Sequence, residues 1–134
     1  MFTFPTSLPP FFKDENIQKE FEENGFVVID FYNDAEINLL NDFFYSLTDI
    51  PKNGFFPTTF FQSKETRDKV DNYVIEIGKR SIDSIFKDIK IVHGSFIIKN
   101  SDKKSELRLH QDMSLVDESK FAGVNIWVPL VDLT

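Results

Sequence analysis

The sequence predicts an α+β fold in which helices pack on one face of a largely antiparallel sheet. Apolar residues recur at helical spacing through the first two thirds of the chain, and the alternation typical of strands begins at about Ile91. Helices that precede a run of strands are typical of this fold class. We therefore expect one domain made of an irregular arm over residues 1–12, a mainly helical part over 13–90 and strands over 91–134.

The composition favours a globular protein that binds a small molecule. Of the 134 residues, 41% are hydrophobic and 16 are Phe, which is enough for a core. The net charge of −7 disfavours nucleic acid and anionic membranes, because both select basic surfaces. The absence of Cys excludes disulfides and thiolate metal sites, and no apolar run reaches the ~18 residues of a membrane span. Since Met1 to Phe12 also lacks the basic start of a secretory signal, we expect a cytoplasmic protein.

The N-terminal region carries the signals of an arm, a helix and a strand. The Pro-rich residues 1–12 predict an irregular arm laid over the domain by its Phe side chains. Asp14 can cap a helix that runs to about Asn24, and Gly25 can end it in the left-handed conformation. The next residues, Phe26 to Asp30, form a short and mostly apolar run, which predicts a strand.

Two further helices are predicted from their caps and their apolar spacing. Asn33, with Glu36 three residues later, has the spacing of a capping box. Ser63 caps the longest periodic segment, Lys64 to about Ile89, whose opposite face is charged and expected to be solvated. The aromatic segment Phe55 to Phe61 between these helices fits either a short strand or a loop beside a pocket.

Three strands are predicted after the helices: Ile91 to Lys99, Glu106 to His110 and Phe121 to Val131. The polar residues 100–105 separate the first two strands in the manner of a hairpin loop. The last strand is apolar on both faces, so both faces are expected to be covered. One face would meet the helices, and the other, which carries Trp127, would face a barrel interior.

The triplet His110-Gln111-Asp112 is the strongest candidate for chemistry. In an extended backbone His110 and Asp112 point to one side and Gln111 to the other. A neutral imidazole and a carboxylate so placed can occupy adjacent positions on an octahedral ion, and iron(II) suits this donor set when oxidation is the task. Taken alone, such a triplet is more often an exposed loop pair or a cap, because Asp readily caps helices and turns.

Three segments together carry a family resemblance. They are Leu109 to Asp112, the apolar segment Asn125 to Thr134, and Phe21 to Ile29, in which a helix ends at Gly before a hydrophobic strand. In their order along the chain, these segments resemble the phytanoyl-CoA dioxygenase family of iron(II)- and 2-oxoglutarate-dependent oxygenases. The resemblance implies helices packed on a double-stranded β-helix, or jelly roll. It also implies iron(II) and 2-oxoglutarate as cofactors, His110 and Asp112 as metal ligands, and hydroxylation of a small organic molecule.

The resemblance also implies roles for residues around the metal ligands. It places Trp127 beside the cosubstrate, Ser95 along the cosubstrate site, and Gln111 behind the ligands, where it fixes their loop. The candidate pocket face continues on the same predicted strand as Ser95, with His93, Ile97 and Lys99. His93 also fits a structural imidazole, and Trp127 also fits a core aromatic. The acid at position 112 implies hydroxylation, since relatives that halogenate have a small residue in its place.

Two features of the family's metal site have no match in this sequence. The second His ligand and a following Arg, which holds the far carboxylate of the cosubstrate, come later in the family's pattern, and no His or Arg follows His110 here. We therefore expect the chain to be the N-terminal portion of a longer oxygenase domain and to be inactive alone. Two alternatives stay open. One is a non-catalytic small-molecule binding module, and the other is a cupin-like metal protein completed by oligomerisation, in which a second subunit supplies a ligand such as His93.

Overall fold

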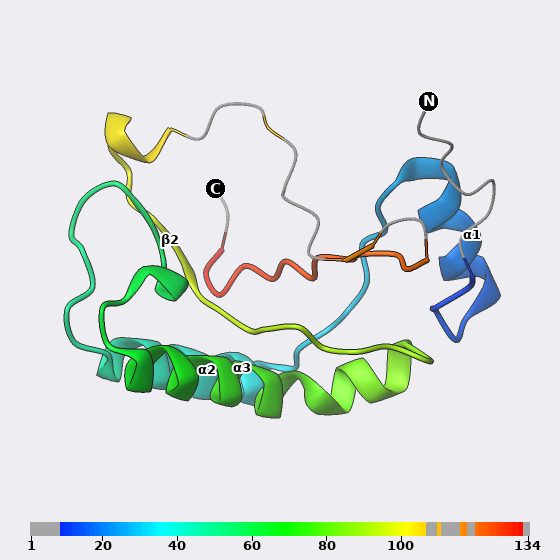
Figure 1. The fold of residues 1–134 in the computed structure, drawn as a ribbon, viewed down its shortest axis with the longest axis horizontal. Helices are drawn as coiled ribbons and strands as arrows, with labels where there is room; N and C mark the ends of the chain where they lie inside the picture. Colours follow the sequence, from blue (N-terminus) through cyan, green and yellow to red (C-terminus); the bar gives the residue numbers. More distant parts are fainter. Residues whose placement is uncertain (1–8, 107–109, 111–115, 118–119, 133–134) are drawn as a thin grey trace.

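The computed structural model describes residues 9–106, 110, 116–117 and 120–132. Its elements, in chain order, are α1 (Glu15–Asn24), α2 (Asp34–Ser46), β1 (Phe55–Pro57), the 3-10 helix η1 (Thr58–Phe60), α3 (Lys64–Ile85), β2 (Ile97–Lys99) and the 3-10 helix η2 (Lys103–Ser105). Helices α2 and α3 lie side by side in one layer, β2 and the later chain cross over them, and α1 lies at one end (Figure 1). Helices combined with a two-stranded antiparallel sheet confirm the α+β class. None of the helices in the described residues combines the length and the apolar composition of a membrane span.

The predicted caps fix the starts of α1, α2 and α3. The Asp14 carboxylate accepts two N–H groups of the first turn of α1, at 2.8 and 3.2 Å. Asn33 and Glu36 form the predicted capping box through two bonds of 2.9 Å. The Ser63 hydroxyl accepts the N–H of Thr66 at 3.2 Å. Each cap satisfies helix N–H groups that have no partner within the helix, which contributes about 1 kcal/mol to helix stability.

The ends of the helices depend partly on packing. Gly25 ends α1 as predicted, at a φ of 77°, and its N–H donates to the Phe21 carbonyl at 2.8 Å. Helix α3 ends at Ile85, earlier than the predicted end near Ile89. The physical reason is that Phe86 leaves the helix and turns its ring into the hydrophobic core, where it is buried.

The first hydrophobic core joins the arm to α1 and to the end of α3. Phe11 and Phe12 are buried, and the rings of Phe12 and Phe86 lie 5.0 Å apart. The buried side-chain oxygen of Gln18 accepts the N–H groups of both Phe11 and Phe12 at 3.0 Å. Each buried Phe contributes roughly 1.5–3 kcal/mol of transfer free energy. The arm is therefore fixed by its Phe side chains, as predicted, where the structure describes it; residues 1–8 lie outside the described residues.

The second hydrophobic core joins α2, α3 and the strand layer. Leu40 and Phe43 come from α2, Val70 comes from α3, and Phe61 and Phe96 come from the chain beside the sheet. Leu40 and Val70 are 2% and 1% exposed. This core holds the sheet against the two long helices.

The sheet consists of β1 and β2 in antiparallel register, with Phe55 opposite Lys99. Thr58 extends the pairing, because its N–H donates to the Phe96 carbonyl at 2.9 Å and its hydroxyl accepts the Phe96 N–H at 3.0 Å. The aromatic segment that the sequence leaves open thus supplies the neighbouring strand. The predicted strand Ile91 to Lys99 is shortened to β2, because its other residues have no strand beside them in the described structure.

Three further strand predictions differ from the structure. Phe26 to Asp30 and Phe121 to Val131 are not strands, because no described segment pairs with their backbone. Of the predicted strand Glu106 to His110, the two end residues are not in a strand and residues 107–109 lie outside the described residues. Apolar alternation is therefore not sufficient, since a strand exists only through hydrogen bonds to a neighbour. The described elements do not make up a jelly roll.

Candidate functional site

The predicted metal ligands lie at the edge of the described structure. His110 is exposed, whereas Gln111 and Asp112 lie outside the described residues. Within the described ranges, no group of three or more His, Cys, Asp or Glu side chains is arranged to hold a metal ion. An imidazole and a carboxylate suit iron(II) as donors, but two ligands do not complete a site. The described residues therefore do not form a whole metal centre, and no chemical step follows from them.

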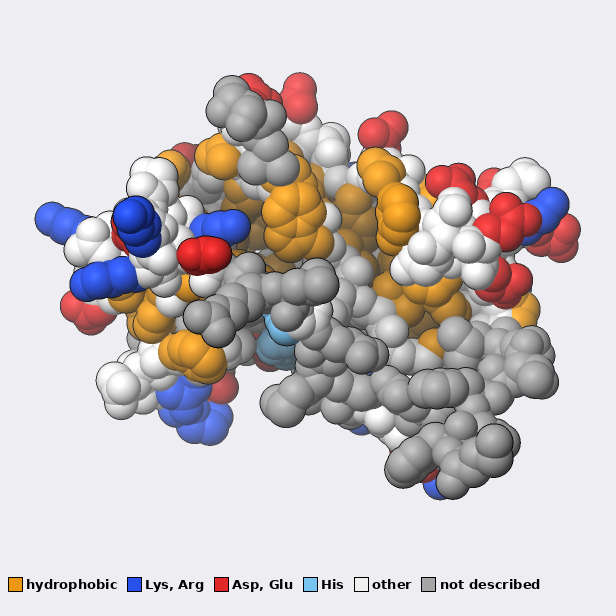
Figure 2. Space-filling model, turned by 90° about the horizontal axis from the view of Figure 1, so that it is seen from above, with side chains coloured by type: hydrophobic (Ala, Val, Ile, Leu, Met, Phe, Trp, Pro, Cys, Tyr) orange, Lys and Arg blue, Asp and Glu red, His pale blue; other side chains and the backbone are white. Residues whose placement is uncertain are grey.

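The apolar segment Phe121 to Val131, which carries Trp127, runs across the molecule above the chain that leads from α3 to β2 (Figure 1). Val128 and Leu130 pack against the two cores, and the Leu130 carbonyl accepts a hydrogen bond from the Asn41 amide at 3.1 Å. The Trp127 side, by contrast, is open, since Trp127 is 66% exposed. Hydrophobic side chains are exposed on this upper face of the molecule (Figure 2). The segment thus meets the helical cores at Val128 and Leu130, whereas Val124 and Ile126 of the same predicted face are 38% and 45% exposed. The prediction that both faces are covered is wrong for the described residues, since the Trp127 face is largely exposed.

The predicted pocket face that carries Ser95 points away from the core. Ser95 is half-buried, Ile97 is 53% exposed and Lys99 is exposed. The alternate residues, Phe96 and Ile98, pack in the second core instead. The structure therefore keeps the predicted residues on one face, and this face is turned toward solvent rather than toward an interior made by described residues.

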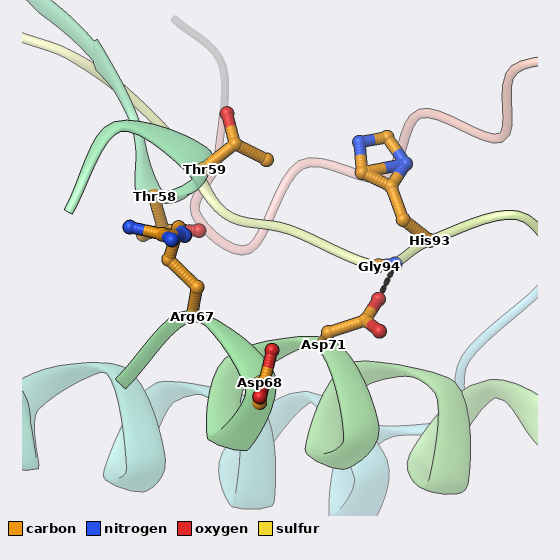
Figure 3. A pocket seen from close by; sticks show the side chains of 7 residues that line it. All are labelled: Thr58, Thr59, Arg67, Asp68, Asp71, His93 and Gly94. Carbon is orange, nitrogen blue, oxygen red and sulfur yellow. Dashed lines mark hydrogen bonds between the residues drawn. The ribbon is translucent and has the colours of Figure 1, made fainter. Parts of the chain in front are cut away.

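His93 lines a pocket of polar and charged residues at the start of α3, whereas its place in a pocket beside the iron ligands stays a prediction. The pocket has a volume of about 240 Å³ and lies between η1, the first turns of α3 and the segment before β2 (Figure 3). Its lining residues are Thr58, Thr59, Arg67, Asp68, Asp71, His93 and Gly94. Sequence reasoning missed Arg67 and Asp71, because they belong to the charged face expected to be solvated. The signal available was their four-residue spacing, which places them on one face of a helix.

Asp71 and Gly94 join α3 to the segment before β2. The Gly94 N–H donates to Asp71 Oδ1 at 2.6 Å. A Cβ atom on Gly94 would lie 2.8 Å from Cγ1 and 2.9 Å from Cβ of Val74, which is closer than real contacts allow. The missing side chain thus lets the backbone lie directly against α3, and this contact holds His93 at the rim of the pocket.

Arg67 is held at the opposite end of the pocket from Gly94 (Figure 3). Its side chain is half-buried, and Nη1 donates to the carbonyls of Phe61 and Gln62, the latter at 3.1 Å. Arg67 and Asp71 form no ion pair with each other in the described structure, because each is bonded to the backbone on its own side. The pocket therefore presents one positive and one negative group that are held apart.

A second hollow, of about 200 Å³, lies where the chain enters α2. Beside it, Arg80 donates to both carboxylate oxygens of Glu36, at 2.8 and 2.7 Å. The pKa of Glu36 is lowered to about 2, mainly by these bonds and to a smaller extent by the bond from the Asn33 N–H. Burial, reinforced by the Glu36 charge, raises the pKa of the Tyr32 hydroxyl. The charged groups here are satisfied by the contact between α2 and α3, so we assign this hollow a structural role.

No family model, no curated protein and no solved structure matches this chain. The resemblance to the phytanoyl-CoA dioxygenase family therefore rests on the sequence motifs alone, at residues 21–29, 109–112 and 125–134.

Proposed function

We propose that this chain belongs to an iron(II)- and 2-oxoglutarate-dependent hydroxylase that acts on a small organic molecule. The observation that carries the proposal is the order of two motifs, His110-Gln111-Asp112 and then the apolar segment Asn125 to Thr134. In this proposal the helices pack on a jelly roll, and His110 and Asp112 are two of three metal ligands. The third ligand and the Arg for the cosubstrate come from outside these 134 residues.

The packing of the apolar segment supports the proposal. Val128 and Leu130 lie against the helical cores, whereas Trp127 on the other side is 66% exposed. A barrel wall is apolar on both faces, with one face against the helices and the other toward the barrel interior. In the proposal, the Trp127 side is that interior side, and its ring lies beside the cosubstrate.

The chain's own residues have separate roles in the proposed site. His110 offers an imidazole nitrogen and Asp112 a carboxylate oxygen, the donor types found in iron(II) oxygenases. Gln111 holds their loop from the opposite side, and Ser95 lines the cosubstrate site. Iron(II), when bound, supplies the activation of oxygen, and 2-oxoglutarate is the cosubstrate that this activation consumes.

The test is an anaerobic titration with iron(II) and 2-oxoglutarate, followed by the metal-to-cosubstrate absorption band. It is run on this chain and on a chain carried through to the stop codon of its gene. We expect the band in the longer chain and its loss in His110→Ala and Asp112→Ala. Asp83→Asn is the control, because it removes an exposed carboxylate of α3 that lies outside the proposed site and should leave the band intact.

Two outcomes would replace the proposal with a different one. If neither chain gives the band while both are folded by circular dichroism, the hydroxylase is excluded and a non-catalytic binding module takes its place. If the 134-residue chain alone binds iron stoichiometrically as an oligomer, and His93→Ala abolishes that binding, the metal site is of the cupin-like kind completed between subunits.

A further inference from the structure

The pocket at the start of α3 keeps a cation and an anion apart within a small volume. We propose that this pocket binds a small linear amino acid as its zwitterion, with the ligand carboxylate on Arg67 and the ligand ammonium on Asp71. The site is separate from the proposed iron ligands, and its ligand needs no metal.

The Arg67 end of the pocket suits a carboxylate. A guanidinium carries five N–H donors in a planar fork. Both bonds that hold Arg67 in the described structure use Nη1, so Nη2 and Nε remain as donors for a ligand. Two parallel bonds from such a fork to a carboxylate are among the stronger charge-assisted pairs. Thr59 lines the same end of the pocket and adds a hydroxyl (Figure 3).

The Asp71 end suits an ammonium group. Asp71 Oδ1 is oriented by the Gly94 N–H, and its second oxygen can accept from a ligand. His93 lines this end as a further polar group. Asp68, between the two ends, is paired with Lys64 at the surface.

The charges of the pocket favour a zwitterion over a simple ion. An anion on Arg67 would also face the carboxylates of Asp68 and Asp71 across the pocket. A cation on Asp71 would likewise face the guanidinium. A ligand that carries both charges pairs with both ends of the pocket. Its positive charge offsets the repulsion between its negative charge and the pocket carboxylates, and its negative charge offsets the repulsion between its positive charge and the guanidinium.

The geometry favours a ligand whose two charges are several bonds apart. Arg67 and Asp71 are four residues apart on α3, which is about 6 Å along the helix axis. Their side chains lean away from each other, Arg67 toward η1 and Asp71 toward Gly94 (Figure 3). In glycine the ammonium and carboxylate groups are bonded to the same carbon, so glycine can contact only one end of the pocket. A chain such as 4-aminobutanoate can reach both, and a pocket of about 240 Å³ lies below the roughly 300–1,000 Å³ of sites for larger organic ligands.

The experiment is a titration of the 134-residue chain, in the presence of a metal chelator, followed by backbone amide shifts in NMR spectra. The probes are 4-aminobutanoate, glycine, butanoate and butylammonium. We expect 4-aminobutanoate to shift the Gly94 and Arg67 amides and to bind about 10-fold more tightly than butanoate or butylammonium, because each of those lacks one charge-assisted contact. Equal affinity for the three four-carbon probes, or the absence of shifts at the pocket, would overturn the proposal.

Two conservative variants separate ligand contact from support of the fold. Asp71→Asn keeps an acceptor for the Gly94 N–H, and Arg67→Gln keeps an amide donor for the nearby carbonyls. In Asp71→Asn, 4-aminobutanoate should lose its advantage over butanoate while butanoate itself still binds. In Arg67→Gln, 4-aminobutanoate should no longer bind more tightly than butylammonium.

The matched controls neutralise an exposed cation and an exposed carboxylate further along the same helix. These are Lys79→Gln and Asp83→Asn, which pair with each other at 3.0 Å in the unsubstituted chain. Both should bind 4-aminobutanoate as the unsubstituted chain does. If they weaken binding as much as the pocket variants, the effect is one of net charge and the pocket is excluded. The chelator makes this result independent of the hydroxylase, so either proposal can fail alone.

Discussion

The helical part of the molecule and the segment Phe121 to Val131 are both rich in apolar residues, yet they are built differently. In the helical part, caps and helix bonds satisfy the backbone, and side chains such as Leu40 and Val70 are enclosed from several directions. In the segment, Leu130 packs inward and Trp127 remains exposed, with no strand beside it in the described structure. The comparison teaches that local signals are enough to specify a helix, whereas an apolar segment forms a strand only when a second segment pairs with its backbone.

The largest effect in a test of this comparison is expected when a side chain enclosed in the helical part is removed. Leu40→Ala should lower the free energy of unfolding by ~2–5 kcal/mol, because it leaves a cavity in the second core. Urea denaturation measures the loss. Leu39→Ala, the neighbouring residue at 47% exposure, is the control and should cost less than about 1 kcal/mol. Equal losses in the two variants would mean that α2 packs by a different face.

A second test compares Gly94, which lies against helix α3, with Gly123 of the apolar segment. Gly94→Ala should lower the free energy of unfolding by about 1–3 kcal/mol, since the added methyl group overlaps Val74 on α3. Gly123→Ala places its methyl group at an ordinary contact, 3.4 Å from Val116, and should change stability by less than ~0.5 kcal/mol. Thermal and urea unfolding of the two variants report the difference. A tolerated Gly94→Ala would show that the segment before β2 does not lie against α3.

A third test uses pH on the ion pair between α2 and α3. The pKa of Glu36 is lowered to about 2 from an ordinary 4.5, so its contribution to stability is present above pH 4.5 and is lost as the pH falls toward 2. Because Arg80 is exposed and solvent screens the pair, we expect this contribution to be small. Glu36→Gln should therefore destabilise the protein near neutral pH and match the unsubstituted chain in strong acid. Glu20→Gln on α1 is the control, and a loss that does not depend on pH would contradict the assignment.

The smallest effects are expected on the exposed side of the apolar segment. Trp127→Ala should change the free energy of unfolding by less than ~0.5 kcal/mol, whereas Leu130→Ala, from the inner side, should cost about 1 kcal/mol. Trp127 is the single Trp of the sequence, so fluorescence reports on it directly. We expect acrylamide to quench it in the folded chain nearly as well as in urea. Strong protection from quenching would show that the Trp127 face is covered in solution.

The starts of the helices could be predicted from the sequence, because each depends on a few neighbouring residues. Asp14, Asn33 and Ser63 each accept N–H groups from residues at most three positions later in the chain. The end of α3 could not be predicted in the same way. It is set by Phe86, whose ring packs on Phe12 from a distant region of the sequence.

The same reasoning explains which residues of the candidate sites could be predicted. The sequence predicts His93 on the pocket face beside the iron ligands, which stays a prediction, and the pocket that His93 lines in the structure was not predicted. Arg67 and Asp71 form the ends of that pocket because Phe61, six residues before Arg67, and Gly94, 23 residues after Asp71, are folded against them, and the second contact is tertiary. The iron ligands remain a prediction from sequence motifs.

Helix α3 contributes to both hydrophobic cores, with Val70 in one and Ile82 in the other. The two cores therefore cannot open independently without breaking a continuous helix, so the helices and their cores form a single cooperative unit. The amide protons of α3 should be the slowest of the chain to exchange with solvent. Because the charged pocket stands on the first turns of this helix, its walls are already ordered before a ligand arrives, and binding there requires little loss of conformational entropy.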